Sequence, residues 1–574
     1  MQTPALEPAA RPTGSGRRWT WVALLVFSCA TVSLLHGCWG QSPAEVAPVG
    51  IPERLGRSED DYTHRILKFD HRFTVWLVAR NAYTLLNRPG AFFDAEPCHP
   101  AENALAFGEP GLALGLLGTP AWLLTGDPVT TYNAVVLAFL LIAPFAMFLL
   151  VRDWTGSPAA GIVAGLLYGF HEIRALDVMH LYIYDSAWTV LALLFAKRWL
   201  EHARWRDALG LAGSVALQLG GSLYPLIAAM AIALPVSVWL AARYGLRRLR
   251  PAQVTVVLGT ILLTAAFVFT PYLELHGSGA LPARDLRAFL MWPELLPGAA
   301  RFPGWVLLLL AAAGLAAGRL PRGGDPRWAL LAAALLTFSL AASPRFYLAI
   351  AAVVPGAEVI RAVTLVYAGT HLTLCILAGL GAAALLRITP RRYAVWAAVA
   401  LIACAYLDTL RPRTLGLTPR FRYAMLRLRP DEAALAFYRM LETQGNDGPI
   451  LEVPLAPDNY GPATDVILLS AYHHRRVSAC YNSFWPDEAA RVTELSSRLP
   501  RPLALQALRQ LGFTTMVVHH GKPDSYAELH RQAIENFANA TGDRFLRRLH
   551  ADEALTAYAI TAPLGAGSTP REGD

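Results

Sequence analysis

Long apolar stretches, separated by short polar segments, run through the chain as far as residue 409. Stretches of about 20 apolar residues predict transmembrane helices. The stretch 111–125 is shorter and rich in Gly and Pro, and counting it as a span would move the following basic clusters to the opposite side of the membrane. We therefore interpret it as a re-entrant or surface helix. The other stretches predict about eleven spans, at residues 19–38, 129–151, 157–172, 181–199, 207–222, 224–243, 252–273, 303–318, 328–343, 365–386 and 393–409.

Basic residues orient these spans. Clusters of Arg and Lys at 197–206, 243–250 and 387–392 fall on the same side as the basic N-terminus, as cytoplasmic loops do. The pattern predicts a multi-pass protein of a bacterial-type inner (cytoplasmic) membrane, with a cytoplasmic N-terminus at 1–18 and a first external loop at 40–128 within a transmembrane domain at 19–409. The first apolar stretch has the basic flank of a cleaved signal, but it is long enough to cross the membrane, and we interpret it as an uncleaved span.

After residue 409 the composition becomes much more charged, and no spanning stretch follows. Short β-rich runs at 450–454 and 514–519 predict strands, and 430–442 and 502–511 predict helices. We therefore expect a small extracytoplasmic α/β domain at 410–574, with a disordered end. Its run His473–Arg476 is interpreted as a solvated, charged turn.

The composition agrees with a membrane protein, because 54% of the residues are hydrophobic and only 16% are charged, against about 25% charged in soluble domains. The net charge of +8 comes from Arg in short loops and does not indicate nucleic-acid binding. The six cysteines lack metal-ligand spacing. Cys98 and Cys480 both fall on the external side, where a disulfide between them is one option.

The first external loop contains a polar stretch, 61–110, that is rich in acids and bases. Apolar side chains recur within it at helical spacing and predict a helix at 62–87 that lies on the membrane surface. Lys68 and Arg72 form its basic side, which we expect to face lipid headgroups or a phosphate. Asp70 and Glu109 lie at the two ends of the stretch. Burial near the membrane raises the pKa of a carboxyl group and suits it to act as a general base. The alternative for Asp70 is a simple ion pair with Lys68 or Arg72.

Two further external segments hold candidate site residues. His180 and Asp185 lie at the entry to a predicted span, where ionisable groups are costly and therefore mark a site. Arg345 and Arg361 lie in a later external loop, where a planar guanidinium suits a phosphate group. The alternative for both Arg residues is anchoring to lipid headgroups. No metal-ligand spacing and no glycine-rich nucleotide loop are present, so neither site is predicted.

The order of several motifs resembles the GT-C superfamily of integral-membrane glycosyltransferases, which includes the protein mannosyltransferases and the aminoarabinose transferases. The resemblance covers roughly residues 60–400. Its motifs are Phe69-Asp70, Phe92-Phe93-Asp94, Phe107-Gly108-Glu109-Pro110, Thr125-Gly126-Asp127-Pro128 with Tyr132-Asn133, Val178-Met179-His180, and the late span from Arg361 to Gly381.

The resemblance implies a GT-C-like fold that moves a sugar from a polyprenyl-phosphate carrier to a cell-envelope acceptor on the external face. Asp70 would then be the base, assisted by Glu109. Asp94, His180 and Asp185 would bind substrate, and the phosphate would contact Lys68, Arg72, Arg345 and Arg361. No cofactor is implied, because the donor sugar is already activated. The sequence departs from the family at His71-Arg72, where an acid or a small residue usually follows the aspartate, so Asp60, Asp61 and Asp94 are alternatives to Asp70.

Two other classes stay open. A glycolipid transporter or flippase would be expected to show paired halves with interrupted helices, and the sequence shows no internal repeat. A catalytically inactive GT-C-like scaffold that displays the C-terminal domain is the second alternative.

Overall fold

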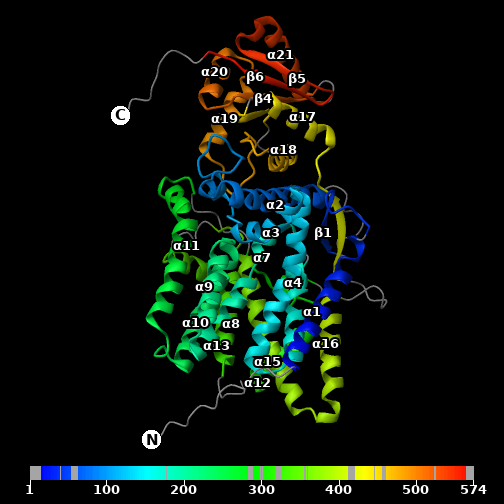
Figure 1. Ribbon diagram of the computed structural model, residues 1–574, viewed down its shortest axis with the longest axis vertical. Coiled ribbons are helices and arrows are strands. Elements are labelled where there is room, and N and C mark those ends of the chain that lie inside the picture. Colours follow the sequence, from blue (N-terminus) through cyan, green and yellow to red (C-terminus); the bar gives the residue numbers. More distant parts are fainter. Residues whose placement is uncertain are drawn as a thin grey trace.

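The computed structural model describes residues 15–38, 40–52, 62–175, 178–281, 289–297, 299, 301–317, 325–354, 357, 360–410, 421–444, 447–455, 460–521 and 525–563. A bundle of helices forms one end of the molecule and a small α/β domain forms the other, with α2 lying across the boundary between them (Figure 1). The bundle contains α1 (Ser15–Leu34), α4 (Pro128–Thr155), α5 (Pro158–Gly169), α8 (Ala187–His202), α9 (Trp205–Leu219), α10 (Leu223–Tyr244), α11 (Pro251–Gly277), α12 (Trp305–Ala317), α13 (Arg327–Ala342), α14 (Pro344–Ala351), α15 (Tyr367–Ile388) and α16 (Ala394–Leu410).

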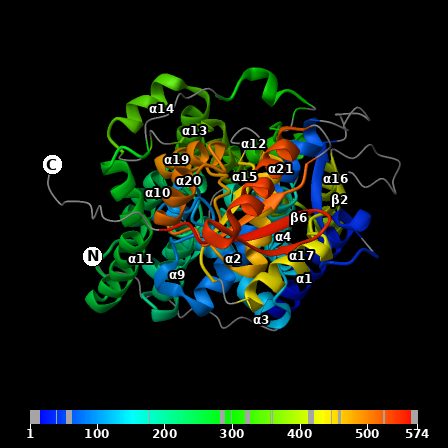
Figure 2. The same cartoon turned by 90° about the horizontal axis from the view of Figure 1, so that it is seen from above.

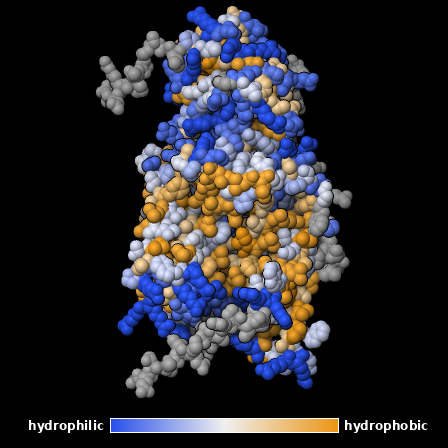
Figure 3. All heavy atoms as spheres, viewed as in Figure 1, coloured by the Kyte–Doolittle hydropathy of each residue, from blue (hydrophilic) through white to orange (hydrophobic). Residues whose placement is uncertain are grey.

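The molecule is an integral membrane protein with several spans. Among the described residues, six helices are long and apolar enough to cross a membrane, or seven if α13 and α14, which are bent by 100°, form one broken span. On the face seen in Figure 3, a broad apolar belt covers the bundle and gives way to polar surfaces at both ends. A helix lies at each of the eleven predicted spans, but α5 and α12 are short. The count of eleven and the orientation of the termini stay predictions.

Local sequence explains where several bundle helices begin. Asp127 and Ser157 accept hydrogen bonds from backbone N–H groups in the first turns of α4 and α5, and each precedes a proline at the first helical position. A capping side chain satisfies a donor that has no partner within the helix, and proline has no N–H there to satisfy. Ser343 and Pro344 start α14 in the same way, which explains why the chain breaks after α13.

Small residues set the packing of α12 against α15. A Cβ atom added at Gly314 would lie 2.0 Å from the Leu377 carbonyl oxygen, and one added at Gly381 would lie 2.0 Å from the Leu310 carbonyl oxygen. Two helices in a membrane approach this closely only through such residues. Most of α15 is buried, so this contact lies at the centre of the bundle.

The helix predicted at 62–87 exists as α2 (Tyr62–Asn87), but its expected place on the membrane surface is wrong. Residues 71–82 are all buried. The helix packs against α3 (Leu112–Thr125) and α4 on one side and against α18 (Tyr460–His473) of the C-terminal domain on the other. Its basic residues meet protein carboxylates instead of headgroups: Arg72 pairs with Asp465, and Arg80 Nε lies 3.4 Å from Glu96 Oε2.

The C-terminal domain contains a four-stranded mixed sheet in the order β3-β4-β6-β5. Strands β3 (Ile450–Val453) and β4 (Thr515–His519) are parallel, and β6 (Leu555–Ile560) is antiparallel to both β4 and β5 (Leu546–Ala551). The other helices are α17 (Glu432–Thr443), α19 (Asp487–Ser497), α20 (Pro502–Gln510) and α21 (Tyr526–Thr541). The predicted strands and helices of this domain are therefore confirmed, whereas its predicted disordered end lies outside the described residues. Seen from above, the domain covers the centre of the bundle (Figure 2).

Three further links join the C-terminal segment to the segment between α1 and α3. Strand β1 (Val46–Pro52) pairs antiparallel with β2 (Phe421–Arg427). Cys98 and Cys480 form a disulfide. The run at 473–476 is not the solvated turn that we expected: His473 and Arg475 are buried, the His474 ring stacks on Tyr83 at 3.6 Å between ring centroids, and Arg476 donates to the Ala101 carbonyl.

The remaining elements are short. They are η1 (His36–Cys38), η3 (Pro89–Ala91), η4 (Ala104–Phe107), α6 (Glu172–Ala175), η5 (Val178–His180), α7 (Leu181–Tyr184), η6 (Trp292–Leu295), η8 (Val363–Val366), η9 (Arg391–Tyr393) and η11 (Gly542–Arg544).

Candidate functional site

A polar cavity of about 510 Å³ lies where α2, the bundle and the C-terminal domain meet. Four of the predicted site residues, which are far apart in the sequence, line it: Asp70, Glu109, His180 and Arg361. The other lining residues are Phe73, Gly108, Tyr182, Ile183, Tyr224, Ala362, Leu365, Tyr460, Tyr481, Asn482, Ser483 and Trp485.

Asp70 has two partners in this cavity. The Tyr481 hydroxyl donates to its Oδ1 at 2.5 Å, and His180 Nε2 lies 3.2 Å from its Oδ2. Burial alone raises the pKa of Asp70, but the hydrogen bonds from His180 and Tyr481 and the charge of Arg361 outweigh it and hold the pKa below its ordinary value. The raised pKa that we expected for Asp70 is therefore wrong, because donors and a cation favour the ionised carboxylate. Asp70 is a carboxylate at neutral pH.

Backbone contacts hold the Asp70–His180 pair in place. Thr74, one turn after Asp70 on α2, donates through its hydroxyl to the Met179 carbonyl. Tyr132 of α4 donates to the neighbouring Val178 carbonyl at 2.8 Å. The first bond fixes η5, and with it His180, against the helix that carries Asp70, and the second fixes η5 against α4.

Glu109 lies at the inner edge of the cavity. Its Oε2 accepts a hydrogen bond from the Leu223 backbone N–H at 3.0 Å, in the first turn of α10. Burial raises its pKa above the ordinary value, and the Leu223 N–H and the Ser222 hydroxyl counter this only in part. The raised pKa expected of a buried carboxyl is thus found at Glu109 and not at Asp70.

An apolar groove of about 390 Å³ lies next to the polar cavity, between α10, α11 and the segment that ends at Ile360. Its lining is almost entirely apolar and includes Met230, Phe269 and Leu273. A small cavity lies between the two spaces, because it shares Glu109 with the polar cavity and Ile360 with the groove. Arg361 directly follows Ile360, so its cation lies where the groove meets the polar cavity.

Five other predicted site residues do not line the cavity. Arg72 pairs with Asp465, and Lys68 lies near the same carboxylate, with its pKa lowered by burial and by the charge of Arg72. The remaining three are Asp94, which is exposed; Arg345, which is exposed on α14; and Asp185, whose carboxylate is buried and accepts a hydrogen bond from Trp188 Nε1 at 2.7 Å. Of the alternatives to Asp70, Asp60 and Asp61 lie outside the described residues.

Sequence reasoning missed the contribution of the C-terminal domain. Tyr460, Tyr481, Asn482 and Trp485 all line the cavity, and Asn482 also donates to the Ala104 carbonyl at 3.2 Å. The signal that would have found them is the Cys98–Cys480 pair, since it places residues 481–485 beside the end of the first external loop.

The described residues contain no group of three or more His, Cys, Asp or Glu side chains arranged to hold a metal ion. The polar groups that line the cavity include one ionised carboxylate, one buried carboxyl group, a histidine, an arginine and several hydroxyl groups.

No protein-family model and no curated protein matches this sequence. Among solved structures, the arabinofuranosyltransferase AftD from mycobacteria aligns with 95% of this chain at a TM-score of 0.53 and 18% identity. The chain has a GT-C-like fold. It spans only 42% of the length of AftD.

Two other GT-C enzymes of known structure also align with most of this chain. ArnT from Cupriavidus metallidurans, solved with undecaprenyl phosphate, aligns with 97% of this chain and 100% of its own, at 13% identity and a TM-score of 0.46. The oligosaccharyltransferase AglB from Archaeoglobus fulgidus, solved with an inhibitory peptide and a dolichol-phosphate, aligns with 88% of this chain and 70% of its own, at 12% identity and a TM-score of 0.44.

Proposed function

We propose that this protein transfers a sugar from a polyprenyl-phosphate carrier to an acceptor on the extracytoplasmic face of a bacterial-type cytoplasmic membrane. The observation that carries the proposal is that two unlike spaces are neighbours: a polar cavity with an ionised carboxylate and an arginine, and an apolar groove, with a small cavity between them. A lipid-linked sugar has the matching parts, because its chain is apolar and its phosphate and sugar are polar. The GT-C-like fold supports the same reading.

The donor would lie with its chain in the groove between α10 and α11 and its phosphate beside Arg361. A guanidinium at this position can make two parallel hydrogen bonds to phosphate oxygens. The sugar would then project into the polar cavity towards Asp70. The groove lies in a part of the bundle where α10 and α11 are extensively exposed, so a chain can enter it from the bilayer.

The transfer step then uses residues of the cavity. Asp70 accepts the proton of an acceptor hydroxyl group, the freed oxygen forms a bond to the anomeric carbon, and the bond from that carbon to the phosphate oxygen breaks. The polyprenyl phosphate leaves with the bonding electrons, and Arg361 stabilises its additional charge. Because Asp70 is ionised at neutral pH, it is in the form that a general base needs.

The other polar groups position the reactants. Tyr481 and His180 hold the Asp70 carboxylate in one orientation. Glu109, at the junction of groove and cavity, orients the acceptor or assists the base. Lys68, Arg72 and Arg345 have no direct role in this proposal, since the first two serve the contact with Asp465 and the third lies away from the cavity.

The test is transfer of a radiolabelled sugar from polyprenyl-phosphate donors to a cell-envelope acceptor fraction, with the purified protein in nanodiscs. Asp70→Asn keeps the shape of the side chain but replaces one acceptor oxygen with an NH2 donor and removes the base, so transfer should fall by roughly 10²–10⁴-fold. Asp94→Asn is the matched control, because Asp94 is exposed and does not line the cavity. It should keep wild-type transfer.

Full transfer by Asp70→Asn would refute the role of this residue. Movement of the intact lipid-linked sugar between leaflets, without transfer, would instead support the transporter class. Monodisperse gel-filtration profiles of both variants exclude misfolding as the cause of a loss.

A further inference from the structure

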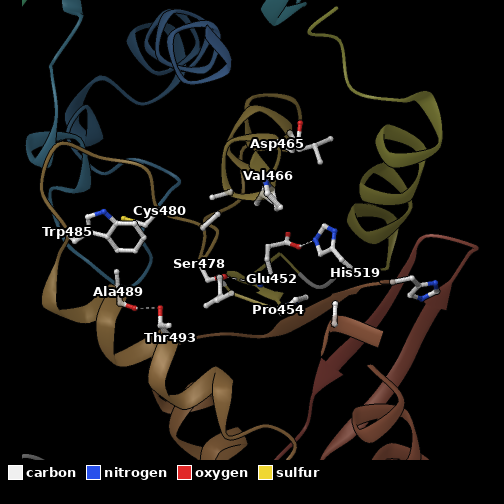
Figure 4. Close-up of a pocket in the computed structure, with 17 residues that line it drawn as sticks. Glu452, Pro454, Asp465, Val466, Ser478, Cys480, Trp485, Ala489, Thr493 and His519 are labelled. Carbon is white, nitrogen blue, oxygen red and sulfur yellow. Dashed lines mark hydrogen bonds and ion pairs between the residues drawn. The ribbon is translucent and has the colours of Figure 1, made fainter. Parts of the chain in front are cut away.

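A second cavity, of about 440 Å³, lies inside the C-terminal domain at the carboxyl ends of β3 and β4 (Figure 4). In α/β sheets, the carboxyl ends of parallel strands are where ligands commonly bind. Helices α18, α19 and α21 and the segment 478–485 form its other walls. This cavity plays no part in the transfer step described above.

A hydrogen-bonded Glu–His pair forms the polar wall. Glu452, the last residue but one of β3, is almost fully buried, and its Oε2 lies 2.7 Å from His519 Nε2 at the end of β4 (Figure 4). The Tyr438 hydroxyl donates to Glu452 Oε1 at 2.9 Å, and the Ser478 hydroxyl accepts from the Glu452 backbone N–H. The carboxylate is thus held rigidly, while each of its oxygens keeps a second acceptor position and the second ring nitrogen of His519 is left for a ligand.

An aromatic side chain forms the opposite wall. The Trp485 ring lies across the cavity from the Glu452–His519 pair, beside Cys480 (Figure 4). It is 38% exposed, which is high for so large an apolar side chain. Val466 and Ala489 extend this apolar wall.

The lining discriminates between classes of ligand. The described residues that line the cavity include two acids and no Lys or Arg, so a phosphate or another anion finds no guanidinium or ammonium group to bind it. A peptide that adds a strand to the sheet at this cavity would have to pair with the outer edge of β3. The backbone of Ile450 on that edge is already hydrogen-bonded, because its N–H donates to the Arg476 carbonyl and its carbonyl accepts from the Ser478 N–H. A neutral sugar fits: the C–H face of its ring packs on an aromatic ring, and its hydroxyl groups bond to a carboxylate and an imidazole.

We propose that the cavity between Trp485 and the Glu452–His519 pair binds a neutral saccharide and serves as a subsite for the acceptor glycan. Trp485 lines both this cavity and the polar cavity that contains Asp70, so a bound oligosaccharide extends from one to the other. The acceptor role rests on the proposed function, whereas saccharide binding does not.

The test measures binding to the full-length protein in nanodiscs by saturation-transfer NMR and calorimetry. The probes are maltotetraose, galactotetraose and arabinotetraose, and a tetraglycine peptide and inorganic phosphate serve as comparators. Ala527→Phe fills the cavity from α21. Ala533→Phe, on the exposed side of the same helix, is the matched control. At least one tetrasaccharide should bind the wild type. Its affinity for Ala527→Phe should be about tenfold or more lower, and its affinity for Ala533→Phe should equal that for the wild type.

A second variant guards against a fold defect in the first. His519→Gln keeps a donor towards Glu452 but removes the imidazole, so saccharide binding should weaken several-fold while the thermal unfolding profile stays that of the wild type. Binding of the peptide or phosphate alone, no binding of any tetrasaccharide, or equal binding by the wild type and Ala527→Phe would overturn the proposal.

Asp70→Asn separates the two proposals, because it should lose transfer and keep saccharide binding. Saccharide binding that depends on Ala527 in a protein that never transfers sugar would support the subsite and contradict the proposed function. If the wild type transfers sugar but Ala527→Phe changes neither saccharide binding nor the acceptor KM, the result would support the proposed function and contradict the subsite.

Discussion

Removal of the Cys98–Cys480 disulfide should destabilise the attachment of the C-terminal domain and disturb the Asp70 site. The bond closes a loop of 382 residues, and it directly precedes Tyr481, which donates to Asp70. We expect the Cys98→Ser/Cys480→Ser variant to lose stability because its unfolded chain gains conformational freedom.

The magnitude follows from the loop length and from the contacts that remain. Chain entropy for a loop of this size gives about 6 kcal/mol as an upper value. Membrane helices keep the unfolded chain compact, so we expect about 2–4 kcal/mol. Three backbone hydrogen bonds keep the two segments together without the disulfide: Cys98 N–H to the Ala479 carbonyl at 2.9 Å, His99 N–H to the Val477 carbonyl at 3.1 Å, and Val477 N–H to the Glu96 carbonyl at 2.7 Å. The variant should therefore fold, but unfold at a lower temperature.

The assay is thermal unfolding in detergent, followed by limited proteolysis of the C-terminal domain, with and without reductant. Cys404→Ser is the matched control, because Cys404 is a free, exposed cysteine. Reductant should lower the midpoint of the wild type and of the control to that of the double variant, and should leave the double variant unchanged. Equal midpoints for the double variant and Cys404→Ser, or an equal response of all three proteins to reductant, would refute the reasoning.

Three further predictions concern packing and the site. Gly381→Ala should destabilise the bundle by about 2 kcal/mol or more, because the added Cβ overlaps a backbone carbonyl of α12; Gly259→Ala, where a Cβ meets nothing within 4 Å, should be neutral or stabilising in the same thermal assay. Tyr481→Phe removes a donor that lowers the pKa of Asp70, so the acidic limb of the transfer rate should move to higher pH by about one unit; an unmoved limb would contradict the role of Tyr481. Arg361→Ala should reduce transfer by roughly 10²-fold or more and Arg361→Lys by less, whereas equal losses in both would point to a structural role.

The sequence predicted secondary structure in the bundle well because apolar length alone reports it. Each predicted span coincides with a helix, and strands at 450–454 and 514–519 became β3 and β4. Pairing between distant segments was not accessible in the same way. Strand β1 contains two prolines and pairs with β2 across more than three hundred residues, and nothing in the local pattern of either segment identifies the other.

Part of the candidate site was predictable, for a physical reason. Ionisable residues next to apolar spans are costly in the bilayer and tend to gather in the polar spaces beside it. Asp70, Glu109, His180 and Arg361 do line one cavity. Arg345 met the same criterion and lies elsewhere, exposed on α14. Proximity to a predicted span therefore does not by itself select among the candidates.

The surroundings of α2, which we had predicted to be lipid headgroups, could have been inferred from its arginines. Its pattern of apolar residues indicates burial, yet Arg72 and Arg80 lie within the same turns, and a buried guanidinium without a carboxylate is strongly destabilising. Lipid headgroups can pair with such cations only on the face of the helix that contacts the membrane. Burial on all sides requires acids from other segments, and Glu96 and Asp465 supply them. Arg80 is met by Glu96 in the segment that follows α2. Arg72 required a carboxylate from a protein layer above the helix, and the C-terminal domain provides that layer and, with it, Tyr481 beside Asp70.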